Sequence, residues 1–249
     1  MESQIKIFDS PDDLSFAAAD EILRLAGKTI SKKGSFTVAL SGGVTPKRLY
    51  GVISSPPYTD RMTWSKVHFF MDDDRQEVPK GNKTDLLMVQ ETMLSKISLP
   101  EANLHAIQTK AADFVQAAAV YEAEIKKHFK LQEGAAPVFD LVLLGLGADG
   151  HTASLFPGIP VPPPPALAFS CWVESVREHR VSLTPFAINT ATDIIFMVEG
   201  ERKASMIRQI LSPEGSSSPG VPAQLIQPLQ GKLTWMLDKQ AAKFLKNSA

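Results

Sequence analysis

The sequence is poor in cysteine and nearly neutral in charge. Cys171 is the only cysteine among 249 residues, which excludes a disulfide framework and a thiolate metal cluster. With 26 basic and 27 acidic side chains, the formal net charge of −1 provides no positive field for nucleic acid or an anionic membrane. No apolar run approaches the roughly 18 residues of a membrane span, and the N-terminus lacks the basic and apolar regions of a signal peptide, so we expect a cytoplasmic protein.

The chain does have a regular alternation of short apolar runs and amphipathic stretches. Hydrophobic residues make up 44% of it and charged residues 21%, which is ordinary for a globular protein, and the length favours one α/β domain over residues 1–249. The patterns predict strands at 5–8, 36–40, 67–71, 139–144, 171–176, 180–183, 194–198 and 233–237, helices at 14–30, 47–53, 84–97, 111–131, 200–211 and 239–245, and loops at 159–165 and 212–220. This order predicts a mostly parallel, twisted sheet flanked by helices in three layers.

One stretch, 139–158, organises the rest of the chain. Its first six residues are apolar, as in a strand buried on both faces of a parallel sheet. Gly147 and Gly150 then allow a tight turn, which delivers the polar side chains of Asp149 and His151 to the carboxyl end of the strand. Ligands of open α/β sheets bind at this edge.

The same stretch satisfies the GxGxxG spacing of dinucleotide-binding proteins. That fingerprint requires a full crossover helix after the third glycine and an acidic residue about 20 positions further on. Pro157 and Gly158 would stop a helix that begins at His151 after little more than one turn, and Glu174 lies beyond a run of prolines. We therefore expect no nicotinamide or flavin cofactor.

Two further strand ends carry polar residues. The sequence SGGVTP at 41–46 follows one strand and precedes a helix, a turn whose free N–H groups suit a phosphate dianion; a plain connecting turn is the alternative. Asp72, Asp73, Asp74 and Arg75 follow another. Either this acidic run lies on a solvated loop, or Arg75 and one aspartate point into a cleft.

In their order and spacing, SGGVTP, VHFF with its acidic residues and arginine, LGLGADGHTASLFPG, HRVSLT and GERKA resemble the 6-phosphogluconolactonases. The resemblance runs from about residue 36 to residue 238. It implies the modified Rossmann fold of the sugar-phosphate isomerase and deaminase-like superfamily. It also implies a carboxylic ester hydrolase without a cofactor, which converts 6-phospho-D-glucono-1,5-lactone to 6-phospho-D-gluconate in the oxidative pentose phosphate pathway.

The resemblance also implies roles for individual residues. His151 would be the general base that activates water, with Asp73 orienting the ring or relaying its proton. Asp149 either takes part or only pins the glycine turn, which Gly147 and Gly150 support. The phosphate-binding residues would be Gly42, Gly43, Thr45, Arg75 and Lys203, with Arg180 as a weaker candidate that is otherwise a surface ion pair. The family usually has Ser-Asn where this chain has Thr84 and Asp85, so no role is transferred to Asp85.

Other reactive residue types have simpler interpretations. His68, His105, His128 and His179 show no mutual metal-ligand spacing, so we expect no metal site. Ser154 lacks the GxSxG elbow of a nucleophile, and Cys171 has the setting of a packed strand residue.

Two other functions are weighed against the lactonase. An amino-sugar phosphate deaminase or isomerase shares the DGH turn, but its pattern continues with IAFNEP, and the glutamate there has no equivalent in TASLFP at 152–157. A non-catalytic sugar-phosphate-binding module would have no need of His151. In each case the expected partner is a small sugar phosphate, with no nucleic acid, membrane or obligate protein partner.

Overall fold

A computed structural model describes residues 3–77, 83–110, 113–212 and 220–245. Its centre is a parallel seven-stranded sheet, and the strand predicted at 139–144 lies in the middle position of this sheet. The order of the strands is β1 (Gln4–Phe8), β10 (Lys232–Asp238), β9 (Asp193–Val198), β6 (Leu141–Leu144), β2 (Phe36–Leu40), β3 (Val67–Met71) and β5 (Leu104–His105). The two-residue β5 was not predicted. Every residue of β2 and of β6 is buried, which explains their continuous apolar sequences.

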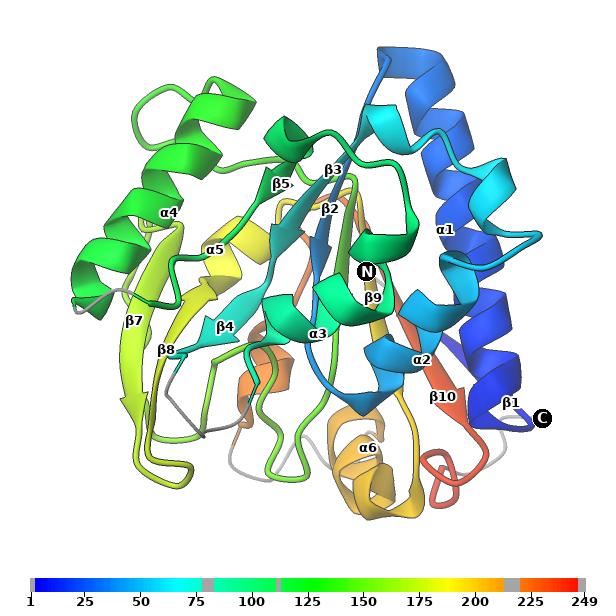
Figure 1. Cartoon of the computed structure of the whole chain (residues 1–249). Coiled ribbons are helices and arrows are strands. Elements are labelled where there is room, and N and C mark those ends of the chain that lie inside the picture. The colour runs from blue at the N-terminus through cyan, green and yellow to red at the C-terminus, as the bar shows by residue number, and fades with distance from the viewer. Residues whose placement is uncertain (1–2, 78–82, 111–112, 213–219, 246–249) are drawn as a thin grey trace.

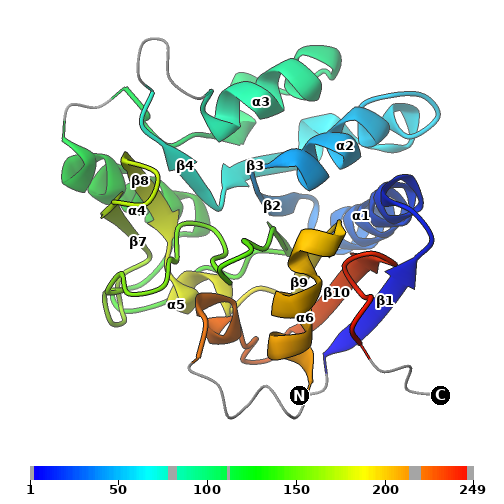
Figure 2. The same ribbon diagram turned by 90° about the horizontal axis from the view of Figure 1, so that it is seen from below.

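Helices cover both faces of this sheet and complete the three predicted layers (Figures 1 and 2). On one face lie α1 (Pro11–Lys33) and α2 (Val44–Ile53); on the other lie α4 (Phe114–Phe129), α5 (Pro185–Ile188) and α6 (Ala204–Leu211). The Ser10 side chain caps α1 by accepting a hydrogen bond from the Asp13 N–H, and Gly34 ends the helix in the left-handed region at φ 87°. None of the described helices has the length and apolar character needed to cross a membrane.

A second, three-stranded antiparallel sheet was not predicted. It consists of β4 (Asp73–Arg75), β8 (Glu178–Leu183) and β7 (Ala168–Val173). The strands predicted at 171–176 and 180–183 correspond to β7, which lies three residues earlier, and to β8, which begins two residues earlier. Of the two alternatives for the acidic run, the solvated loop is wrong, because Asp72, Asp73 and Asp74 are all buried where the chain passes from β3 into β4.

Several helix boundaries also differ from the predictions. The helix expected at 84–97 is α3 (Asp85–Thr92), which is capped by the Thr84 side chain and followed by a short 3-10 turn, Leu94–Lys96. The helix expected at 239–245 is wrong, since these residues form turns. The Asp238 carboxylate accepts hydrogen bonds from the Ala241 and Gly200 N–H groups and thereby favours a turn there. Most of the loop expected at 212–220 lies outside the described residues.

Candidate active site

A cleft of about 350 Å³ lies at the carboxyl ends of β2, β6 and β9. Its walls are the turns that follow these strands, together with side chains from β4 and β8 of the small sheet. Nine of the residues predicted to form the site line it: Gly42, Gly43, Thr45, Asp73, Arg75, Gly147, His151, Arg180 and Lys203. The fold therefore brings together residues from widely separated parts of the chain, as expected at this edge of a parallel sheet.

His151 is held in one orientation at the wall of the cleft. Its Nδ1 lies 2.6 Å from an Asp149 carboxylate oxygen, and its ring stacks on Phe156 with centroids 4.3 Å apart. The hydrogen bond with His151 lowers the pKa of Asp149 to about 2, so the carboxylate is ionised at neutral pH and only accepts hydrogen bonds. Nδ1 must then be the donor, which leaves a lone pair on Nε2 when the ring is neutral. Nε2 has no hydrogen-bond partner among the described residues.

The turn that carries this pair depends on glycine at position 147. A Cβ atom there would lie within 3.0 Å of His151 Nδ1 and of an Asp149 carboxylate oxygen, so any side chain would displace the pair. Backbone bonds hold the turn, with the Gly147 N–H donating to the His151 carbonyl at 2.7 Å. No helix begins at His151: residues 151–158 form turns and one isolated β-bridge, and Ala153 has a left-handed φ of 46°.

Asp73 lies deeper in the wall, and its hydrogen bonds are to residues other than His151. Its carboxylate accepts a hydrogen bond from the Ser154 hydroxyl and another, at 3.2 Å, from Arg180 Nη1. Ser154 is fully buried, and its hydroxyl is hydrogen-bonded to Asp73. This agrees with the absence of a nucleophile elbow around it. The carboxylate partner of the His151 ring is Asp149, and the predicted relay through Asp73 has no direct hydrogen bond to support it.

The two aspartates on either side of Asp73 each bind backbone N–H groups. The Asp72 carboxylate accepts a hydrogen bond from the Asp73 N–H at 2.7 Å. The Asp74 carboxylate accepts hydrogen bonds from the N–H groups of Arg75, Asp85 and Leu86, so it fixes the start of α3 from outside the helix. Burial raises the pKa of Asp74 to about 7.

The two arginines of the cleft belong to one buried network of ion pairs. Arg75 Nη2 donates to both carboxylate oxygens of Asp85 at 3.0 Å, and Arg180 Nη2 donates to Glu178 at 2.8 Å. Arg180 is only 8% exposed, so its interpretation as a surface ion pair is wrong. The Nε atoms of Arg75 and Arg180 are buried without a hydrogen-bond partner among the described residues.

Asp85 is a cleft residue to which the sequence assigned no role. A Cβ atom on Gly42 would lie within 3.0 Å of its carboxylate, so Asp85 touches the glycine turn after β2. Burial and the neighbouring Asp73 raise the pKa of Asp85 to about 6, although Arg75 opposes this shift. The signal in the sequence was its match to the asparagine position of the family's Ser-Asn pair, where this chain has a carboxylate instead.

Two further positive groups face the cleft: the N-terminus of α2, and Lys203, which follows β9. Helix α2 follows Gly43, which has a φ of 99°, and no side chain caps its first N–H groups. Lys203 belongs to the 3-10 turn Glu201–Lys203 and makes no ion pair with any of the described residues. Burial lowers the pKa of Lys203, and the negative charge of Asp149 opposes that effect. The helix terminus and Lys203 thus offer a second place for an anion in the same cleft.

Comparison with known proteins confirms the resemblance. A family model described as glucosamine-6-phosphate isomerases/6-phosphogluconolactonase matches residues 9–235. A 6-phosphogluconolactonase of Synechocystis is 39% identical over 223 residues, 88% of each chain, and one of Nostoc is 34% identical over 97% of this chain and 98% of its own. The solved 6-phosphogluconolactonase of Trypanosoma cruzi superposes with a TM-score of 0.86 at 26% identity, covering 98% of this chain and 97% of that one.

Proposed function

Because the chain belongs to the family of glucosamine-6-phosphate isomerases and 6-phosphogluconolactonases, we propose that it hydrolyses 6-phospho-D-glucono-1,5-lactone to 6-phospho-D-gluconate. The observation that carries the proposal is the pair His151 and Asp149, which leaves Nε2 available in a cleft that also holds Arg75, Arg180 and Lys203. A base and an anion site lie in one cavity, and the substrate has both an ester and a phosphate.

In this proposal His151 acts as the general base. Nε2 takes a proton from water while the water oxygen bonds to the lactone carbonyl carbon, and the Asp149 carboxylate stabilises the imidazolium that forms. The bond between the carbonyl carbon and the ring oxygen then breaks, and the proton on Nε2 passes to that oxygen. A lactone is an activated ester, so the step needs no covalent intermediate.

Asp73 has a positioning role in this proposal. Its carboxylate accepts hydrogen bonds from Ser154, in the loop after His151, and from Arg180 on β8. It therefore ties the loop next to the base to the small sheet. A role in proton relay would require Asp73 to reach the ring in the substrate complex.

The phosphate of the substrate would lie between the start of α2 and the cations of the cleft. A phosphate monoester carries a charge of about −1.5 to −2 at neutral pH, which the helix terminus and two cations roughly balance. Among the cations that line the cleft, Lys203 makes no ion pair with the described residues, whereas Arg75 already pairs with Asp85. We therefore assign the larger share of phosphate binding to Lys203.

The deaminase alternative is disfavoured by the residues directly after His151. Proton transfer between sugar carbons needs a further carboxylate, and residues 152–157 contain none. Two of these positions already have structural tasks: the Thr152 hydroxyl donates to the Gly145 carbonyl at 2.8 Å, and Phe156 stacks on the His151 ring.

The test is an assay with freshly prepared phosphogluconolactone, in which acid release is measured against spontaneous hydrolysis. We expect His151→Ala to lower kcat by about 10²–10⁴-fold, the usual contribution of a general base, with 6-phosphogluconate binding retained. His179→Ala is the matched control, because that exposed ring lies outside the cleft. Undiminished turnover by His151→Ala would refute the role of the base. Release of ammonia from glucosamine 6-phosphate would support the deaminase instead.

A further inference from the structure

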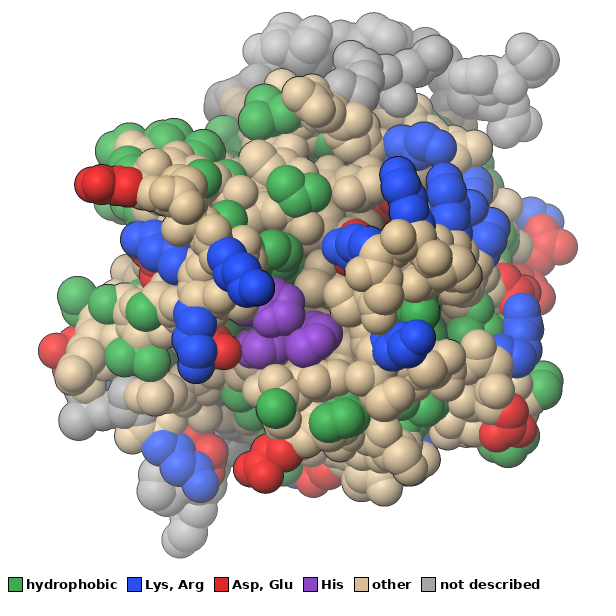
Figure 3. Space-filling view, turned by 90° about the horizontal axis from the view of Figure 1, so that it is seen from above, with side chains coloured by type: hydrophobic (Ala, Val, Ile, Leu, Met, Phe, Trp, Pro, Cys, Tyr) green, Lys and Arg blue, Asp and Glu red, His purple; other side chains and the backbone are tan. Residues whose placement is uncertain are grey.

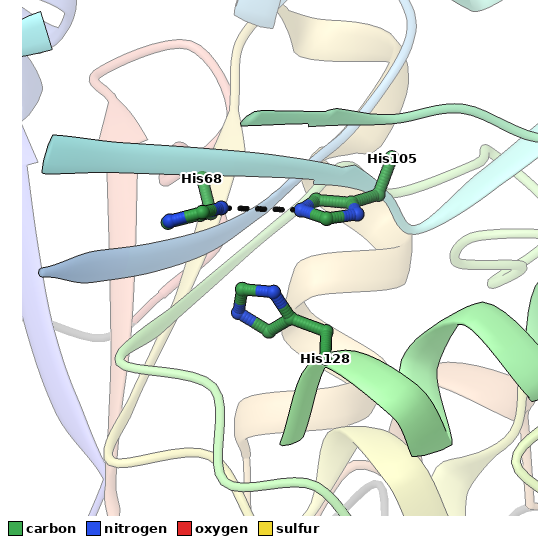
Figure 4. Close-up of side chains that lie close together, drawn as sticks. All are labelled: His68, His105 and His128. Carbon is green, nitrogen blue, oxygen red and sulfur yellow. Dashed lines mark hydrogen bonds between the residues drawn. The ribbon is translucent and has the colours of Figure 1, made fainter. Parts of the chain in front are cut away.

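Three histidines far apart in the sequence meet on the face of the sheet that α4 covers. His68 belongs to β3, His105 to β5 and His128 to α4, and one ring nitrogen from each lies within 4.8 Å of the other two. The close-up shows the three rings gathered between the strands and the helix (Figure 4). Their sequence spacing shows no metal-ligand motif, and the fold nevertheless brings three of the four histidines together.

The distances in this cluster, which we call the histidine cluster, suit a common ion. His68 Nδ1 and His105 Nε2 are 3.2 Å apart, and the His128 ring centroid lies 4.6 Å and 4.7 Å from the centroids of the other two rings. A tetrahedral zinc ion with bonds of about 2.0–2.1 Å to nitrogen requires nitrogen–nitrogen separations of about 3.3 Å. The 3.2 Å separation of His68 and His105 is now a hydrogen bond, whose proton a bound ion would displace, and the ligand nitrogens of all three rings lie within 4.8 Å of one another.

A carboxylate outside the cluster orients one of the rings. Glu124 precedes His128 by one turn of α4, and its carboxylate lies 2.9 Å from His105 Nδ1. An ionised carboxylate only accepts, so Nδ1 donates and the neutral ring directs the Nε2 lone pair at His68. Metal-binding histidines are typically held in this way by a carboxylate on their second nitrogen.

The surroundings keep two of the rings in the neutral form that binds metals. Burial, followed by the charges of His105 and His68, lowers the pKa of His128 to about 4, and burial also lowers the pKa of His68. Phe70 closes the floor of the cluster by stacking on His105 at 4.1 Å. The charge of Glu124 raises the pKa of His128, and the charge of Lys33 lowers it.

The histidine cluster is open to solvent and separate from the cleft. In the view from above, histidine side chains gather at one place on the surface, with basic side chains nearby (Figure 3). His105 is buried, whereas His68 and His128 are partly exposed, so an ion can enter from outside. His68 precedes Asp72 by four strand residues, which places the cluster about 13 Å from the edge with the cleft.

We propose that His68, His105 and His128 bind a divalent transition-metal ion of the zinc class, with solvent at the remaining position. Imidazole ligands suit zinc, copper, nickel and cobalt better than magnesium or calcium. Because its ligands come from β3, β5 and α4, the bound ion fastens that helix to the edge of the main sheet. The site has a structural role and takes no part in the chemistry of the cleft.

The experiment uses the full-length protein after removal of metal with a chelator. Titration with Zn²⁺ should show one site per chain by calorimetry, and Zn²⁺ should raise the Tm, because an ion that binds only the folded state stabilises it. Co²⁺ should give the visible absorption bands of tetrahedral coordination, and Mg²⁺ should have no effect. His128→Ala should lower the Zn²⁺ affinity at least tenfold, and Glu124→Gln by about 10–100-fold.

His179→Ala is the matched control and should bind Zn²⁺ like the parent. If His128→Ala is unstable without metal, His128→Gln serves in its place, since it retains more of the packing volume. An equal rise in Tm for the parent and the His128 variants, or no Zn²⁺ binding by the parent, would overturn the proposal. Lactone hydrolysis is not a readout here, so failure of the proposed function would leave this result unaffected.

Discussion

The cleft and the histidine cluster use the same pair of groups for different purposes. In both, a carboxylate contacts Nδ1 of an imidazole: Asp149 on His151 at 2.6 Å, and Glu124 on His105 at 2.9 Å. In the cleft the ring's other nitrogen has no partner among the described residues, whereas in the cluster it points at a second histidine at 3.2 Å. A solitary oriented ring can move a proton, and several rings directed at one point can share an ion.

The largest expected effect comes from a variant that disturbs the orientation of His151 but keeps the residue. It tests whether the oriented ring of the cleft differs in function from the rings of the histidine cluster. Gly147→Ala places a Cβ within 3.0 Å of both His151 Nδ1 and the Asp149 carboxylate, so the pair must move. A displacement of about 1 Å is enough to lower catalysis by about 10²-fold, and we expect that loss in kcat/KM for the phosphorylated lactone.

Gly145→Ala is the matched control, because its Cβ would be in ordinary contact, 3.8 Å from the Ser41 hydroxyl oxygen. Both glycines belong to the same turn and line the same cleft. Similar kcat/KM values for the two variants would show that the pairing of His151 with Asp149 does not matter to the reaction. Zn²⁺ binding should be the same in both.

The next largest effect concerns the phosphate end of the cleft. Lys203→Ala should raise KM for the phosphorylated lactone by about tenfold, the effect of losing about 1.4 kcal/mol of binding energy. KM for unphosphorylated gluconolactone should stay unchanged, because that substrate has no phosphate for Lys203 to contact. Steady-state kinetics with the two substrates measure this difference. An equal rise for both would place Lys203 away from the phosphate.

Replacement of Asp85 should change KM less than replacement of Lys203 does, and in the opposite direction. Its carboxylate is hydrogen-bonded to Arg75 and faces the glycine turn, so at pH 7.5 we expect it to compete with the phosphate of the proposed substrate. Asp85→Asn should lower KM by about threefold, with Asp113→Asn as a control outside the cleft. Since the pKa of Asp85 is about 6, the parent's carboxyl becomes protonated as the pH falls below 6. The ratio of the parent KM to the variant KM should therefore approach one at pH 5, and a ratio that does not change with pH would contradict this role.

The sequence was most informative where function depends on neighbouring residues. Asp149 and His151 are two positions apart on one glycine turn, so the sequence placed both at the end of β6, although it named Asp73 and not Asp149 as the partner of the ring. The order of the parallel strands then placed this turn beside Gly42 and Gly43. Local patterns and the general rule for parallel sheets were sufficient for both steps.

The sequence was least informative where function or structure depends on residues from separate elements. His68 and His105 are 37 positions apart, and only the pairing of β3 with the unpredicted β5 brings them together. The burial of Asp72, Asp73 and Asp74 depends on backbone donors and on Arg180 from β8. An acidic run is normally solvated, and no local pattern reveals partners that the chain supplies about 100 residues later.

The smallest expected effect tests whether burial and the neighbouring rings suppress the protonation of His128. The pKa of His128 is about 4 in the folded protein and about 6.5 when unfolded, so between these values the unfolded chain binds more protons. This contribution to stability is complete above pH 6.5 and is lost as the pH falls toward 4. The groups that act on His128 are His68 and His105 on the strands, Glu124 on its own helix and Lys33 at the end of α1.

The variant His128→Gln, measured in metal-free protein, removes this pH-dependent loss of stability, whereas other titrating groups, such as Asp74, affect both proteins alike. The Tm of the variant relative to the parent should therefore be about 2–4 °C higher at pH 5 than at pH 7.5, a small value because solvent screens this half-exposed ring. A difference in Tm that is independent of pH would mean that His128 is protonated as easily in the cluster as in water, and the cluster would then resemble three solitary rings.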